Sequence, residues 1–370
     1  MRCLVSIPSI RNPAVISEYA RNAELHKFDL RDAFFLMITE DSADKASYKR
    51  ELGAAGLDGE VMGAAEREAF MRENGIIEYL DLIPKRSHAE TSFGLIYQWL
   101  NKKFEYGFFI DDDTSPIDHI DYFGSHLSNL NFSGEVDSVS SDKGWVNVLH
   151  QTFEEHRLYP RGYPYSKMNE KNSIGKANVP EGKVLISQGL WTNVPDLDAI
   201  RILMDGDLNG QAKTRLAERH FRGNFVAEKG NFQTVCSMNL SFRREIIPAF
   251  YQFPMDDNPY KIGRFDDIWS GLVAKAVADR AGGYIMNGYP LCTHNKAARS
   301  TFKDVALESP GYESNEFFSE TVGNAQPREG SAIEVSRGIA QELSIRGKTD
   351  FTRYCGEHLG RWVDLCEETQ

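Results

Sequence analysis

The chain has 370 residues, of which 41% are hydrophobic and 26% are charged, and its formal net charge at neutral pH is −12. A chain of this length and apolar content can bury a large core, so wholesale disorder is excluded. The negative charge argues against nonspecific binding to nucleic acids or anionic membranes, because those partners attract cationic proteins.

No stretch of the sequence approaches the roughly 18 apolar residues that a membrane span requires, and the N-terminus lacks a secretory signal pattern. We therefore expect no membrane span and a cytoplasmic location. The five cysteines are scattered and form no C-x-x-C pair, so neither a disulfide framework nor a zinc knuckle is predicted.

Short apolar runs alternate with helical patterns in the first third of the chain. Strands are predicted at 3–8, 33–39, 76–83 and 104–110, and helices at 15–25, within 42–74 and at 92–102. This alternation indicates an α/β fold with a mainly parallel central sheet. Ligands of such sheets bind beyond the carboxyl ends of the strands, which is where Pro8, Asp41 and the acidic run 111–113 fall.

The pattern is looser in the rest of the chain. Loops with short strands are predicted over 135–185, partial helix over 196–220, strands at 235–242 and 284–291, and a helix at 268–281. These give a predicted catalytic domain over 1–307, a polar linker over 308–331 and a helical extension over 332–370. The extension contains two amphipathic helices that could pack on the domain or on a partner subunit of a homo-oligomer.

Three carboxylates, Asp111, Asp112 and Asp113, follow the apolar strand at 104–110. Adjacent anions repel one another, and a hard cation such as Mg²⁺ or Mn²⁺ relieves that repulsion. On an extended chain Asp111 and Asp113 project to the same side, so we predict that this pair holds the metal. The alternative is an acidic turn that caps a helix near Pro116.

His294 and Lys296 follow the last predicted strand. The histidine could be a third ligand of the same metal, and the lysine could neutralise a phosphate. Taken alone, a histidine in this position is more often a surface residue.

Asp266 and Asp267 stand immediately before the predicted helix at 268–281. Capping of that helix accounts for one of them. It does not account for both, beside an arginine and a tryptophan, so we predict that they orient sugar hydroxyls or act as a general base.

Two further segments combine rings with small or polar residues. Residues 156–166 are rich in tyrosine and proline and contain Arg161, and residues 186–196 contain Trp191. Aromatic rings commonly stack on sugars, and arginine commonly binds diphosphate. A proline-rich surface loop is the alternative for the first segment, and the second is weak evidence by itself.

Seven segments, in the same order, resemble the family of reversibly glycosylated polypeptides, whose plant members are UDP-arabinopyranose mutases. They are residues 6–12, 109–113, 161–166, 189–196, 236–242, 263–269 and 288–297. The resemblance implies a GT-A-like nucleotide-sugar-binding fold, a UDP-sugar bridged by a metal, and interconversion of pyranose and furanose forms. It also implies reversible glycosylation of one arginine, which is Arg161 by motif match. The family has a second arginine shortly after this motif, whereas this chain has Lys167 and Met168.

The hypothesis places the metal on Asp111, Asp113 and His294, where it stabilises the departing UDP. Arg161 or a carboxylate such as Asp267 then holds the sugar, with Asp266 as the other catalytic carboxylate. The residues predicted to bind the nucleotide sugar are Pro8, Ser9, Arg11, Asp41, Asp112, Trp191 and Lys296. Two other functions stay open: a metal-dependent glycosyltransferase with an external acceptor, and a self-glycosylated carrier with little turnover.

Overall fold

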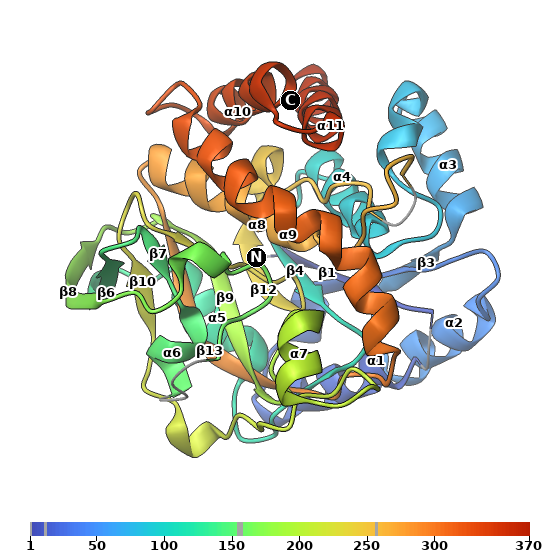
Figure 1. The fold of residues 1–370 in the computed structure, drawn as a ribbon. Helices are drawn as coiled ribbons and strands as arrows, with labels where there is room; N and C mark the ends of the chain where they lie inside the picture. The colour runs from blue at the N-terminus through green and yellow to red at the C-terminus, as the bar shows by residue number, and fades with distance from the viewer. Residues whose placement is uncertain (1, 11–12, 154–157, 256–257) are drawn as a thin grey trace.

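The computed structural model describes residues 2–10, 13–153, 158–255 and 258–370 (Figure 1). In this part of the chain, one sheet has 11 strands, with the order β3-β2-β1-β4-β12-β9-β13-β10-β6-β8 and β5 paired to β13. Its strands are β1 Arg2–Pro8, β2 Ala33–Ile38, β3 Gly59–Met62, β4 Phe104–Ile110, β5 Thr114–Pro116, β6 Gly134–Ser141, β8 Asn172–Val179, β9 Val184–Asn193, β10 Phe225–Ala227, β12 Asn239–Arg243 and β13 Tyr284–His294. A small second sheet pairs β7 Trp145–Val146 with β11 Phe232–Gln233.

The helices connect these strands and extend the chain beyond the last one. They are α1 Ala14–Leu25, α2 Lys45–Ala54, α3 Ala64–Glu73, α4 Ser92–Leu100, α5 Tyr122–Leu130, α6 Val148–Phe153, α7 Ala199–Asp205, α8 Asp266–Arg280, α9 Thr301–Asn324, α10 Ala332–Arg346 and α11 Asp350–Glu368. The predicted α/β class is therefore confirmed.

The four N-terminal strands β3, β2, β1 and β4 are parallel to one another. Beyond them the sheet is mixed, because β12 runs antiparallel to both β4 and β9, while β13 runs parallel to β9. The parallel arrangement that strand–helix alternation predicts thus holds where the alternation is regular, and it ends where the sequence pattern loosens.

Both faces of the parallel strands are buried, which explains their continuous apolar sequences. In β2, Phe34 and Leu36 belong to one core cluster, whereas Phe35 and Met37 belong to the cluster on the opposite face. Figure 1 shows α4, α8, α10 and α11 on one side of the sheet and α1 and α2 on the other. The molecule is therefore layered, with helices over each face.

Two predicted elements in the first 100 residues are wrong. Residues 76–83 form a 3-10 helix, η2 Ile77–Leu82, and the third parallel strand is instead β3, Gly59–Met62, within a region predicted as helical. A short apolar run has no periodicity that separates a strand from a helical turn. β3 is only four residues long, and Val61 is its one buried side chain, so its own signal is weak.

The predicted linker over 308–331 is also corrected. Most of it belongs to α9, Thr301–Asn324, a helix of 24 residues that contacts α7, α8 and α10. The proline and glycine in this segment suggested a linker, but Pro310 and Gly311 both lie inside the helix. Packing of α9 on the core outweighs their low helix propensity.

The C-terminal helices α10 and α11 agree with the predicted ranges and pack on the rest of the chain. Their buried side chains share one core cluster with the buried apolar residues of α8; they include Ile339, Leu343, Leu359 and Trp362. Of the two alternatives for these helices, the structure shows packing on the domain. Among the helices that the structure describes, none combines the length and the apolar character needed to cross a membrane.

Candidate functional site

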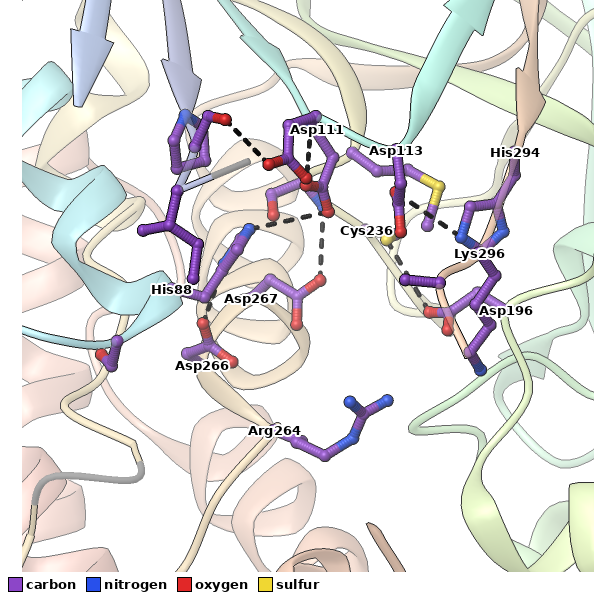
Figure 2. Close-up of a pocket in the computed structure, with 18 of the residues that line it drawn as sticks. His88, Asp111, Asp113, Asp196, Cys236, Arg264, Asp266, Asp267, His294 and Lys296 are labelled. Atoms are coloured by element: carbon purple, nitrogen blue, oxygen red, sulfur yellow. Dashed lines mark hydrogen bonds and ion pairs between the residues drawn. The ribbon is translucent and has the colours of Figure 1, made fainter. Parts of the chain in front are cut away.

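A cavity of ≈ 300 Å³ lies at the carboxyl ends of the parallel strands. Its walls come from the loop after β1, the turn after β4, the end of β13, the loops that carry Arg161 and Asp196, and the start of α8 (Figure 2). Of the residues predicted from the sequence, those that line it are Pro8, Ser9, Asp111, Asp112, Asp113, Arg161, Asp266, Asp267, His294 and Lys296.

The acidic run after β4 forms a tight turn. The Asp112 backbone N–H donates to Asp111 Oδ1 at 2.8 Å, and the Thr114 N–H donates to the Asp111 carbonyl at 3.2 Å. The chain is therefore not extended here, and Asp112 lines the cavity together with its neighbours, where it accepts a hydrogen bond from Ser9 Oγ at 2.8 Å. β5 follows the turn, so the alternative of a cap for a helix near Pro116 is wrong.

The surroundings of Asp111 disfavour its negative charge, which a bound cation would stabilise. Burial and the charge of Asp113 raise the pKa of Asp111 to about 7, and His88 opposes this shift. A cation shared by the two carboxylates would remove the repulsion between them.

His294 is buried at the end of β13, so the alternative of a surface histidine is wrong. Its Nδ1 lies 2.7 Å from the Val194 carbonyl, which fixes Nδ1 as the donor nitrogen. Nε2 is the other ring nitrogen, and it lies 3.8 Å from Asp113 Oδ1. A histidine oriented in this way by a backbone carbonyl is typical of metal ligands.

His88, which the sequence reasoning missed, lies between two acidic groups. Its Nδ1 donates to Asp266 Oδ2 at 3.0 Å, and its Nε2 lies 3.9 Å from Asp111 Oδ2. Burial alone would lower the pKa of His88, but the hydrogen bond and charge of Asp266 raise it to about 10. The cap of α8 is Phe265, so Asp266 serves the cavity and does not cap the helix.

Arg161 is held between two carboxylates. Its Nε donates to Asp196 Oδ2 at 3.0 Å, and its Nη2 donates to Asp267 Oδ2 at 3.1 Å. Its Nη1 donates to the Arg264 carbonyl and to Asp267 Oδ1. Burial disfavours the guanidinium charge, yet Asp196 and Asp267 raise the pKa of Arg161 well above its usual value. In this geometry Arg161 is a cation that fixes two acids.

Asp196 is a second functional candidate, to which the sequence patterns assigned no role. Burial would raise the pKa of Asp196, but Arg161 and nearby cations lower it to about 2. The sequence feature that could have indicated a role for Asp196 is its position directly after Pro195, close to the end of β9. Its pairing with Arg161, 35 residues away, was not visible in the sequence.

Two predicted residues that the structure describes, Asp41 and Trp191, do not line the cavity. Asp41 instead accepts a hydrogen bond from the Ala65 N–H at the start of α3, and Glu40 lines the cavity in its place. Trp191 is buried in the core cluster on the α6 side of the sheet. These two predictions are corrected, because the Asp41 carboxylate is engaged at the start of α3 and Trp191 packs inside the core. Arg11 lies outside the described residues.

The side chains at this end of the cavity are of the chemical types that bind a divalent cation. Asp111 and Asp113 offer hard oxygen ligands, and the Nε2 of His294 is available beside Asp113. Across the described ranges, no three His, Cys, Asp or Glu side chains converge closely enough to enclose a metal ion by themselves. Phosphate oxygens and water would have to complete the coordination, as is usual for Mg²⁺ bound with a nucleotide.

The chain is similar in sequence to a family model and to several plant proteins. The family model described as reversibly glycosylated polypeptide matches residues 77–370. The probable UDP-arabinopyranose mutase 1 of Pisum sativum is 31% identical over 214 residues, which cover 55% of this chain and 50% of the relative. The probable UDP-arabinopyranose mutase 2 of Solanum tuberosum is 28% identical over 285 residues, covering 74% and 70%. The chain therefore spans about half the length of the first of these relatives.

Two solved structures resemble the chain more distantly. Glucosyl-3-phosphoglycerate synthase from Mycobacterium tuberculosis, in complex with Mg²⁺ and UDP, has 12% identity and a TM-score of 0.39, covering 86% of this chain and 79% of that one. A mannosyltransferase from Pyrobaculum calidifontis, in complex with GDP-Man and Mn²⁺, has 12% identity and a TM-score of 0.37, covering 100% and 73%. At these TM-scores the similarities support no conclusion about ligand or activity.

Proposed function

Because this chain belongs to the reversibly glycosylated polypeptide family, we propose that it is a UDP-sugar mutase that interconverts pyranose and furanose forms of a UDP-linked, arabinose-like sugar. One observation carries the proposal: Asp111 and Asp113 line the same cavity as Arg161 and Asp267. A GT-A-like site needs the first pair for the nucleotide diphosphate, and sugar chemistry needs the second pair within reach of the anomeric carbon.

The proposed cofactor is Mn²⁺ or Mg²⁺, with Asp111, Asp113 and His294 as the protein ligands. When bound, the cation would neutralise charge on the departing diphosphate. Lys296 lines the same cavity and adds a positive charge for the phosphates. A cytoplasmic location and a homo-oligomer belong to the same proposal and rest on the sequence alone.

The carboxylates of α8 supply the chemistry at the sugar. Asp267 lies in the first turn of α8 and is oriented by Arg161, so one of its oxygens can approach developing positive charge at the anomeric carbon. Asp266 is paired with His88, so a proton can be held or passed between them. Ring opening and reclosure at a different hydroxyl would then give the other ring form before UDP recaptures the sugar.

Self-glycosylation of Arg161 needs one more step, because a protonated guanidinium is a poor nucleophile. Asp267 lies 3.1 Å from Nη2 and is the acceptor in position for the proton. The alternative is that Asp267 itself holds the sugar while Arg161 stays charged. Intact-mass analysis followed by peptide mapping of the protein incubated with UDP-sugar separates these two routes.

The direct test incubates the purified protein with UDP-arabinopyranose and Mn²⁺, without any acceptor. We expect UDP-arabinofuranose as the product, identified by chromatography. An ordinary glycosyltransferase would give slow hydrolysis only, and a self-glycosylated carrier would give one stoichiometric sugar adduct without a furanose product. Either of these results would replace the mutase proposal.

Removal of a metal ligand tests the site itself. Asp113→Asn should weaken Mn²⁺-dependent UDP binding by at least roughly tenfold, measured by titration calorimetry. Asp118→Asn is the matched control, because Asp118 is an exposed carboxylate paired with Arg21 and does not line the cavity. If Asp113→Asn and the wild type bind UDP with equal affinity in Mn²⁺, the proposal that Asp113 is a metal ligand is wrong.

A further inference from the structure

Arg264 faces the cavity from the side opposite the acidic turn. Figure 2 shows its side chain rising from below Asp267, away from Asp111. It lies just before α8 with a backbone φ of 65°, in the left-handed region that non-glycine residues rarely adopt. This unusual conformation lets the Arg264 carbonyl accept a hydrogen bond from Arg161 while the side chain enters the cavity wall.

The guanidinium of Arg264 has unused donors. Its Nε donates to Glu308 Oε1 at 2.5 Å, and its Nη1 lies 3.8 Å from Asp304 Oδ1, beyond hydrogen-bond distance. Within the described ranges, neither Nη1 nor Nη2 of Arg264 donates a hydrogen bond to the protein, although the side chain is only 13% exposed.

Lys296 is in a similar situation in the same cavity. Its Nζ is buried and has no hydrogen-bond partner among the residues that the structure describes. Burial lowers the pKa of Lys296, and the charge of Asp196 opposes this shift. Buried cationic donors without acceptors are costly, so two of them around one cavity favour a ligand that brings several anionic oxygens.

Glu308 fixes the direction of Arg264. It lies on α9, is fully buried, and accepts hydrogen bonds from the Ala199 N–H at 2.8 Å and from the Tyr312 hydroxyl. Because these partners hold its carboxylate, Glu308 can hold the Nε edge of Arg264 and leave the two Nη groups toward the cavity. The carboxylate also raises the pKa of Arg264, against the effect of burial.

We propose that Arg264 binds the phosphate oxygens of a nucleoside diphosphate together with Lys296, and that Glu308 is the residue that positions Arg264 for this contact. The fork of an arginine matches two phosphate oxygens at once, which a lysine cannot do. The inference rests on the proposed function, because it adds Arg264 and Lys296 to the metal at Asp111 and Asp113 as groups that hold the diphosphate of the UDP-sugar between them.

The first test compares two probes, UDP and uridine, in Mn²⁺ by titration calorimetry. Arg264→Gln should weaken UDP binding roughly 10- to 100-fold, because a charge-assisted hydrogen-bond pair to phosphate is lost. Its uridine affinity should stay within about twofold of the wild type, since uridine has no phosphate. Arg264→Lys keeps the positive charge but loses the forked guanidinium. Its affinity for UDP should therefore lie between those of the wild type and Arg264→Gln.

The matched control is Arg243→Gln. Arg243 is similarly buried, with 15% of its side chain exposed, but it pairs with Glu105 at the other end of β4 and does not line the cavity. It should bind UDP as the wild type does. If Arg264→Gln also binds UDP with wild-type affinity, the inference is overturned while the UDP site itself stands.

A second pair of variants tests the positioning role of Glu308. Glu308→Asp keeps the charge but withdraws the oxygens by one methylene, whereas Glu308→Gln keeps the reach and an acceptor but loses the charge. Positioning predicts that the preference for UDP over uridine falls more in Glu308→Asp than in Glu308→Gln. A merely structural role would lower the melting temperature and leave that preference unchanged, and this result would contradict the inference.

Inorganic pyrophosphate separates this inference from the proposed function. If the wild type binds pyrophosphate but not UDP, and Arg264→Gln loses the pyrophosphate, the anion site stands and the nucleotide proposal fails. If the wild type binds neither probe, both fail. We expect pyrophosphate to compete with UDP for binding to the wild type. In Arg264→Gln this competition should be lost.

Discussion

His126 shows at the scale of a residue how burial alone sets a charge state. It lies on α5 with no exposed surface, and its ring nitrogens contact the Ser187 hydroxyl and the Asn239 side-chain oxygen, both at 2.9 Å. Burial lowers the pKa of His126 from its usual 6.5 to about 3, and Asn239 opposes this only in part. The folded protein therefore holds a neutral imidazole across the physiological pH range.

This predicts a loss of stability on acidification. The lowered folded-state pKa means that the unfolded chain takes up the proton first, so the contribution is present above pH 6.5 and is lost as the pH falls toward about 3. From pH 7 to pH 5 we expect His126 to cost about 2 kcal/mol of unfolding free energy. His126→Gln should lose that part of the pH dependence in urea titrations at the two pH values. If the difference in unfolding free energy between pH 7 and pH 5 is the same in His126→Gln as in the wild type, other groups cause it.

The carboxylates of the site show what a residue pattern can predict. The acidic run 111–113 was recognisable because it ends an apolar strand, and strand ends are where ligands of such sheets bind. His88 was not recognisable, because its partner Asp266 lies 178 residues away. Glu308 was hidden for a further reason, since its segment was predicted to be a linker.

At the scale of an element, α9 connects the C-terminal part of the chain to the site. Asn315 donates from its side-chain nitrogen to the Gly162 carbonyl at 2.7 Å and accepts from Trp269 Nε1 at 3.1 Å. Glu316 accepts from the Ser166 N–H at 3.0 Å. The helix therefore holds the loop that carries Arg161 and, through Glu308, also holds Arg264.

The approach of α9 to the site depends on Gly311. A Cβ at this position would lie 2.4 Å from Cδ2 of Phe265, a fully buried ring. Gly311→Ala should therefore lower the unfolding free energy by about 1–3 kcal/mol and weaken UDP binding, because α9 must move away from α8. Denaturant unfolding and calorimetry measure the two effects.

Gly360→Ala is the matched control for this change. Gly360 is also inside a helix, but a Cβ there would come no closer than 3.9 Å to Ala340 Cβ. Alanine should stabilise α11 by roughly 0.5–1 kcal/mol, because glycine is the poorer helix former. Equal effects at both positions would mean that the contact with Phe265 does not limit the position of α9.

At the scale of the whole molecule, the C-terminal helices share their core with the sheet domain. Trp362 is fully buried, stacks on Tyr251 with 5.1 Å between ring centroids, and donates from Nε1 to the Ile247 carbonyl at 3.2 Å. Helices that complete a common core are expected to unfold with it. The division into a domain over 1–307 and an extension over 332–370 stays a prediction, and cooperativity is its test.

Trp362→Ala should lower the unfolding free energy by about 3–5 kcal/mol in one transition, in which circular dichroism and tryptophan fluorescence change together. Ile345→Ala, an exposed position on the same helical pair with 77% of the residue accessible, should change it by less than about 0.5 kcal/mol. A first transition that loses helical signal while fluorescence persists would show that the extension is an independent unit.

The sequence alone determined the α/β class, the end of a buried strand at Ile110 with the acidic run 111–113 directly after it, and the two C-terminal helices. These depend on local hydrophobic periodicity, which is written in consecutive residues. The tertiary structure alone decided that β12 enters the sheet antiparallel, that α9 is a helix, and that Glu308 pairs with Arg264. Those features depend on burial and charge pairing between distant segments, which no local pattern records.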